Sequence, residues 1–119
     1  MLIDQKPLRI TFQEGPRVLT IKLEGHVAGA QVDELSRAWR SVAPSRGRKN
    51  VVIDLHDLIF IDQAGIAVLA GICRQTGARF NADTPLTRYF AEEALYRALE
   101  DIKVKGVAYN AWTLGAGNE

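Results

Sequence analysis

Residues 51–65 read VVIDLHDLIFIDQAG, and this segment sets the interpretation of the whole chain. Its first part, the apolar run Val51–Ile53, is typical of a central strand that is covered on both faces. Asp62 stands three residues before Gly65, where its carboxylate can accept hydrogen bonds from the free amides of a first helical turn. We therefore expect a strand here, followed by a helix that begins near Asp62 and ends at Gly77.

The residues before this segment predict a hairpin and a helix. Residues 8–12 and 18–23 alternate apolar and polar side chains on either side of a turn at residues 14–16, which indicates two paired strands. Gly25 ends the second strand. The next helix follows from apolar side chains at helical spacing, which are Val32, Leu35, Trp39 and Val42.

The residues after the segment predict a short strand at Arg79–Asn81 and a third helix opened by Pro85, since proline is tolerated in a first turn. Its expected core stripe consists of Leu95, Leu99 and Ile102. Residues 104–109 form the last expected strand. The resulting order predicts an α/β fold with a mixed sheet of four to five strands and three to four helices packed on it.

Composition and charge describe one small domain. The 119 residues are 47% hydrophobic and 24% charged, which argues against disorder. A net charge of +1 gives no electrostatic argument for a nucleic-acid partner. The longest uncharged apolar run, residues 64–73, is well short of the ~20 residues that cross a bilayer, so we expect no membrane insertion. No export signal is visible, which predicts a cytoplasmic location. We expect a lead over residues 1–7, one domain over 8–109 and a flexible tail over 110–119.

The central segment resembles the STAS domain, the module of bacterial anti-sigma-factor antagonists and of the cytosolic tails of sulfate transporters. That family reads approximately V-x-x-D-L-S-x-V-x-F-I-D-S-S-G-L, and Gly25 matches the glycine that ends its second strand. The matching positions of the central segment are Asp54, Leu55, Phe60, Ile61, Asp62 and Gly65. The resemblance implies a STAS fold and a cofactor-free, non-catalytic module that acts by protein–protein docking in signal transduction and transcription regulation.

The chain departs from the family at its usual switch. In phosphorylation-switched members, the residue after the loop aspartate is a serine or threonine that a partner kinase modifies. Here that position is Gln63, followed by Ala64, and no hydroxyl side chain occurs from Ile61 to Gln75. Phosphoserine would add about −1.5 to −2 charges at a helix N-terminus, whereas Gln63 keeps the position neutral. Gln63 is either a fixed partner-binding position or an inert surface residue.

The second helix carries a further signal, because it has no polar face until Arg74. A helix that is apolar on all sides is either buried on both sides within its own chain or exposes an apolar surface that binds a partner. We expect the second case. The expected partner-binding residues are Gly25, His26, Asp62, Gln63, Ala64, Gly65, Val68 and Ile72. The resemblance implies a partner such as an anti-sigma factor or a related kinase. The alternative is the small STAS subunit of a phospholipid-transport ABC complex, which binds an ATPase. The sequence leaves open whether the chain forms a homodimer.

An enzyme or phosphoacceptor would have to use the acid-rich loop 54–62, with His56 and Asp57, or else Cys73. We expect none, because no second acidic cluster completes a metal site and Cys73 shares the helix face of Ile66, Leu69 and Ala70. His26 and His56 lack the spacing of metal ligands. Five cations occur within thirteen residues, Arg37, Arg40, Arg46, Arg48 and Lys49. They form either a solvated surface or a site for an acidic or phosphate-bearing partner.

Overall fold

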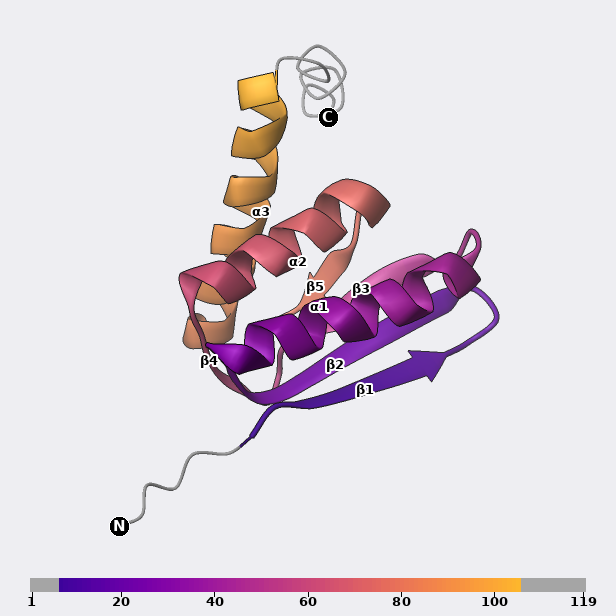
Figure 1. The fold of residues 1–119 in the computed structure, drawn as a ribbon, viewed down its shortest axis with the longest axis horizontal. Coiled ribbons are helices and arrows are strands. Elements are labelled where there is room, and N and C mark those ends of the chain that lie inside the picture. Colours follow the sequence, from indigo (N-terminus) through magenta and orange to yellow (C-terminus); the bar gives the residue numbers. More distant parts are fainter. Residues whose placement is uncertain (1–6, 106–119) are drawn as a thin grey trace.

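Helices and strands alternate along most of the chain (Figure 1). The structure, a computed structural model, describes residues 7–105, with side chains up to residue 100, so the predicted lead and tail fall almost entirely outside it. In chain order the elements are β1 (Arg9–Glu14), β2 (Val18–Val27), α1 (Ala30–Val42), a 3₁₀ helix (Ala43–Arg46), β3 (Asn50–Asp54), β4 (Leu58–Ile61), α2 (Gln63–Thr76), β5 (Arg79–Asn81) and α3 (Pro85–Lys105).

The five strands form one mixed sheet. β1 pairs antiparallel with β2, as the hairpin prediction requires, and the order continues β2-β3-β5 with parallel pairing. β4 pairs in parallel with the last part of β2, after a register shift between Gly25 and His26. The predicted α/β fold class is confirmed. β4 was not among the predicted strands, because its four residues are all apolar and show no alternation of apolar and polar side chains.

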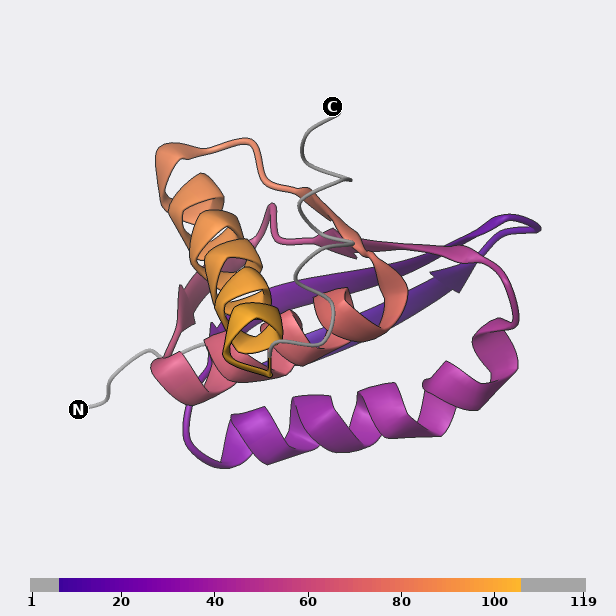
Figure 2. The same cartoon turned by 90° about the horizontal axis from the view of Figure 1, so that it is seen from above.

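Within residues 7–105, helices cover only one face of the sheet. Along β2, the side chains of Leu19, Ile21 and Leu23 are buried, whereas the intervening Thr20 and Lys22 are partly exposed. In β3, Val51 and Ile53 are buried and Val52 is only half-buried. The expectation that β3 is covered on both faces is therefore wrong, because α1 and α2 lie side by side on the same face (Figure 2).

The first two helices follow their sequence patterns. α1 buries Val32, Leu35 and Trp39 as predicted, and the indole nitrogen of Trp39 donates a hydrogen bond of 3.1 Å to Gln75 of α2. α2 is capped by Asp62 at its start and by Gly77 at its end. Gly77 adopts φ 68°, a left-handed conformation that glycine accepts without strain. These predicted helix limits are confirmed.

The third helix differs from its prediction. α3 packs on α2 through small side chains, so its buried stripe runs through Phe90, Ala91, Ala94 and Ala98. Leu95, which we expected in the core, is 42% exposed. Val104 and Lys105 belong to α3 and not to a strand, while residues 106–109 and the side chain of Ile102 lie outside the described part. Within residues 7–105, no helix is both long and apolar enough for a membrane crossing.

Candidate protein-docking site

The carboxylate of Asp62 joins two segments at the start of α2. One oxygen, Oδ1, accepts a hydrogen bond of 2.8 Å from the amide of Gly65, which is the predicted helix cap. The other, Oδ2, accepts one of 3.1 Å from the amide of Gly29, in the connection between β2 and α1. The Asp62 amide itself donates to the carbonyl of Val27 at 3.0 Å. We call these contacts the Asp62 bridge, and they fix the β2–α1 connection against the first turn of α2.

Glycines make this close approach possible. Gly29 has φ 59° and ψ −128°, a backbone conformation that L side chains rarely adopt. A Cβ on Gly65 would lie 2.6 Å from Cγ1 of Ile61 and 2.9 Å from Cγ1 of Val27, so no larger residue fits there without displacement. Gly25 is buried and has φ 93°, and its amide donates to the carbonyl of Asp57. The predicted glycines therefore shape the site from below its surface.

The predicted partner-binding residues divide by exposure. Gln63 and Ala64 are exposed, and His26, Asp62 and Val68 are partly exposed. Ile72 is only 1% exposed, so the expectation that it forms an open docking surface is wrong. Ile72 lies on the buried side of α2 together with Leu69 and Cys73. Other sides of the helix, with Ala67, Val68 and Gly71, are partly exposed. The exposed part of the predicted surface is therefore the first turn of α2.

Two exposed apolar side chains beside this turn were missed by the sequence prediction. Ile59 and Phe60 of β4 are 44% and 45% exposed. The ring of Phe60 lies next to that of His26, with centroids 6.4 Å apart. The signal in the sequence was the uninterrupted apolar run of residues 58–61, which exceeds what a four-residue edge strand can bury. We call the surface at the ends of β2, β4 and the start of α2 the α2 tip, consisting of His26, Phe60, Asp62, Gln63 and Ala64.

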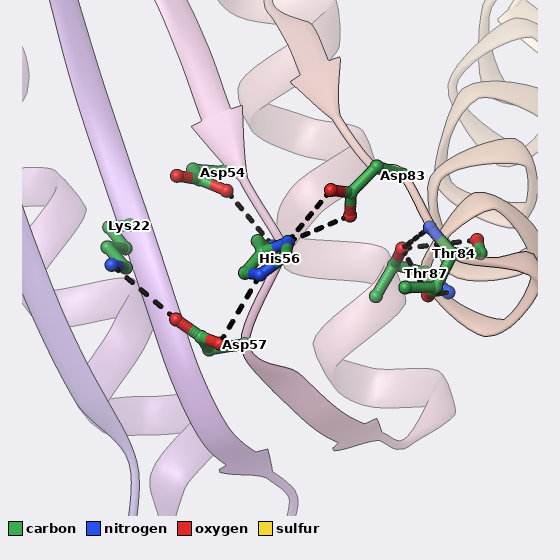
Figure 3. Close-up of polar contacts among 7 residues, drawn as sticks. All are labelled: Lys22, Asp54, His56, Asp57, Asp83, Thr84 and Thr87. Carbon is green, nitrogen blue, oxygen red and sulfur yellow. Dashed lines mark hydrogen bonds and ion pairs between the residues drawn. The ribbon is translucent and has the colours of Figure 1, made fainter.

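A second polar cluster surrounds His56 in the β3–β4 loop (Figure 3). Its Nδ1 lies 2.9 Å from both carboxylate oxygens of Asp83, in the β5–α3 loop, and we call this pair the His56 bridge. On the other side, Nε2 lies 3.8 Å from Asp57, which also pairs with Lys22 at 3.5 Å. The His56 amide donates to Asp54. Two loops that are distant in sequence are thus held together by charged side chains.

The titration of the bridge follows from these contacts. The hydrogen bond to Asp83, then its charge and that of Asp57, raise the pKa of His56 above its ordinary value. The same hydrogen bond lowers the pKa of Asp83. The two side chains therefore stabilise each other's charged forms.

The residues considered for catalysis do not form one site. Asp54, His56 and Asp57 lie together, whereas Asp62 bonds to Gly29 and Gly65. Cys73 is buried as predicted, and burial raises the pKa of its thiol to about 11, so it stays protonated at neutral pH. Among residues 7–105, no group of three or more His, Cys, Asp or Glu side chains could hold a metal ion.

Part of the basic segment lies near the opposite ends of the β2 and β3 strands. Arg46, Arg48 and Lys49, together with Arg17, line an open hollow of about 540 Å³. Lys49 pairs with Glu14 at 3.7 Å, and Arg46 donates to the Lys49 carbonyl. Lys49 and Arg46 therefore already have partners within this segment, which fits the interpretation of a solvated surface.

Comparison with known proteins agrees with this architecture. A family model described as STAS domain matches residues 9–80, from β1 into β5, and so includes both the α2 tip and the β3–β4 loop. No curated protein matches the sequence. STAS domains are generally non-catalytic binding modules that mediate protein–protein interaction. Because the match spans more than half of the chain, this protein belongs to the STAS domain family.

Proposed function

We propose that this protein is a non-catalytic STAS regulatory module, similar to an anti-sigma-factor antagonist, that docks a cytoplasmic protein partner through the α2 tip. The observation that carries the proposal is the Asp62 bridge. It fixes the β2–α1 connection and the first turn of α2 relative to each other, so the exposed side chains of Gln63 and Ala64 stand on a rigid base. A preorganised surface loses less conformational entropy on binding.

The chemistry of the tip suits a partner with a mixed apolar and polar surface. Phe60 supplies an exposed aromatic ring, and aromatic residues are enriched in protein–protein interfaces. Gln63 supplies an uncharged amide that can both donate and accept hydrogen bonds. We propose an anti-sigma factor of the kinase type as the partner, with the ATPase of an ABC transporter as the alternative.

Binding at this tip is expected to be independent of phosphorylation there. Gln63, at the position of the family phosphoacceptor, has no hydroxyl group. The hydroxyls at the start of α3 are poor substitutes, because Thr87 is only 2% exposed and its Oγ1 lies 2.8 Å from that of Thr84. Regulation would then come from the amount of protein or from modification elsewhere.

A charge placed at position 63 tests the docking surface. We expect Gln63→Arg to weaken binding to the purified partner by about tenfold or more, which corresponds to ~1.4 kcal/mol. The matched control is Gln13→Arg on β1, an exposed glutamine outside the tip, which should bind as the wild type does. The candidate partners to test are any anti-sigma kinase or transporter ATPase that the neighbouring genes encode, each measured by isothermal titration calorimetry. Equal binding by Gln63→Arg and wild type would exclude the α2 tip as the docking site.

Restoring a hydroxyl tests the regulatory part of the proposal. With a kinase that binds the protein and with ATP, we expect phosphate on Gln63→Ser and none on residues 61–75 of the wild type. Gln13→Ser is the control for a serine exposed elsewhere. Mass spectrometry locates the phosphate. A kinase that binds Gln63→Ser but leaves it unmodified would contradict the assignment of position 63 as the phosphoacceptor position.

A further inference from the structure

Four cations line the hollow of about 540 Å³ at the start of β2 and β3, which we call the basic hollow. It lies at the end of the sheet opposite the α2 tip, where the β1–β2 turn meets the loop before β3 (Figure 1). Arg17 comes from the turn, whereas the other three, Arg46, Arg48 and Lys49, come from the 3₁₀ helix and the loop after it. The Asn50 amide donates a hydrogen bond of 3.0 Å to the Arg17 carbonyl, which holds the two segments together.

Local contacts account for only two of these cations. Lys49 pairs with Glu14 at 3.7 Å, and Arg46 donates to the Lys49 carbonyl. In the part of the chain that the structure describes, no hydrogen bond or ion pair is found for the side chain of Arg17 or Arg48. Both are exposed, and neither belongs to a helix. The attraction of a helix C-terminus for positive charge, which applies to Arg46, therefore does not explain them.

The lining of the basic hollow suits anions and not flat rings. Among its described lining residues, none is acidic and none is aromatic. Asn50 also lines it, and a side-chain amide can donate hydrogen bonds. Arginine presents several donors in a planar fork that matches the oxygens of a phosphate group. Four positive charges around one hollow favour a ligand with more than one phosphate group.

We propose that the basic hollow binds a compact ligand with two or more phosphate groups, which is either free in solution or part of a lipid headgroup. The guanidinium groups of Arg17 and Arg48, one from each segment, hold the phosphate oxygens, and Lys49 adds positive charge. Because no aromatic side chain is among the described lining residues, the phosphates and not an attached base are recognised. The proposal is independent of the docking function, since the basic hollow shares no residue with the α2 tip.

Isothermal titration calorimetry with tripolyphosphate tests the site. We expect one ligand per chain, and Arg48→Gln should weaken the binding by about tenfold because charge-assisted hydrogen bonds are lost. The matched control is Arg37→Gln, the same change at an exposed arginine of α1 that does not line the hollow. It should bind within about twofold of the wild type. Equal weakening by the two variants would show attraction to net charge alone and would overturn the proposal.

A change at Glu14 should act in the opposite direction. Glu14→Gln removes the carboxylate that pairs with Lys49, so we expect tripolyphosphate to bind several-fold more tightly. Glu34→Gln, the same change at an exposed position of α1, controls for the added net charge. A gain for Glu14→Gln that does not exceed the gain for Glu34→Gln would contradict a site at Lys49.

Vesicles distinguish the two sources of the phosphate groups. A headgroup source predicts sedimentation with vesicles of phosphatidylcholine and cardiolipin, a lipid with two phosphates, and not with phosphatidylcholine alone. A free source predicts binding of tripolyphosphate without binding to either vesicle. In each case Arg17→Gln and Arg48→Gln should weaken the binding and remain folded by circular dichroism. The absence of binding both to tripolyphosphate and to cardiolipin vesicles overturns the proposal.

Discussion

Two carboxylate bridges join loops at the same edge of the sheet, yet they are built differently. Parallel strands end together at this edge, so the loops after β2, β3, β4 and β5 meet there. The Asp62 bridge connects one carboxylate to the backbone amides of Gly29 and Gly65. The His56 bridge connects two side chains, His56 and Asp83, that are 53% and 54% exposed.

This difference separates a structural support from an adjustable contact. Backbone amides in packed segments are already fixed, and a helix N-terminus attracts negative charge, so the Asp62 bridge costs little additional ordering. An exposed ion pair must immobilise two side chains and is screened by salt, so its net contribution is small. The α2 tip therefore depends on the first bridge and not on the second.

The largest effect is expected at a buried position in the second half of α2. Ile72→Glu would place an unpaired charge on a side chain that is 1% exposed, and we expect a loss of several kcal/mol or complete unfolding. Ile59→Glu, the same change at a 44% exposed position, should cost less than about 1 kcal/mol. Urea unfolding compares them. A stable Ile72→Glu protein would contradict the burial of Ile72 in the core.

The next effect comes from the glycine beneath the Asp62 bridge. Gly65→Ala adds a Cβ against Ile61 and Val27, so we expect destabilisation by ~1–3 kcal/mol from overpacking. In the same helix, Gly71→Ala meets only the end of Arg74 at 3.7 Å and should stabilise by up to about 1 kcal/mol. Thermal unfolding should show a loss of stability for Gly65→Ala and a gain for Gly71→Ala. An equal gain in stability for both variants would contradict the close packing at Gly65.

The bridge itself is expected to contribute a moderate amount. Asp62→Ala removes both amide contacts and should cost ~1–2 kcal/mol, as the loss of a helix cap does. Asp62→Asn keeps one acceptor oxygen for Gly65 but turns its amide group toward Gly29, so we expect a smaller loss. Chemical denaturation measures both. If Asp62→Ala is as stable as the wild type, the bridge does not support the tip.

Local patterns in the sequence predicted the elements that local chemistry determines. The sequence predicted the hairpin, the apolar positions of α1 and the limits of α2. These features depend on alternation, helical spacing and capping residues, which act within a few positions. The position of Asp62 as a helix cap was also predicted. Its second contact, to Gly29, joins residues 33 positions apart and has no signature in either segment.

Predictions failed where a distant element decides the outcome. The apolar surface of α2 indicated a docking helix that exposes Ile72, but Ile72 is part of the buried core. On α3, Leu95 was expected in the core but lies outside the buried stripe of Phe90, Ala91, Ala94 and Ala98. The His56 bridge spans 27 positions between two loops, and nothing in either loop identified its partner.

The smallest effect is expected from the His56 bridge, and it depends on pH. Because the pKa of His56 is raised above 6.5, its stabilisation is fully present below about pH 6.5 and is lost as pH rises through the raised value. Because the pKa of Asp83 is lowered from 3.8, its contribution is present above that pH and is lost as pH falls through the lowered value. The bridge is therefore intact in the mildly acidic range between them.

NMR titration of the His56 ring tests the origin of this dependence. Asp83→Asn should lower the midpoint most, because the hydrogen bond to Asp83 is the largest cause of the raised pKa. Asp57→Asn should lower it less, and Asp54→Asn least, since their charges act through space and more weakly. In thermal unfolding, the difference between wild type and His56→Gln should shrink from mildly acidic to alkaline pH, and this shrinkage should vanish in the Asp83→Asn background. If Asp57→Asn had the larger effect on the midpoint, the salt bridge to Asp57 and not the hydrogen bond to Asp83 would hold the β3–β4 loop.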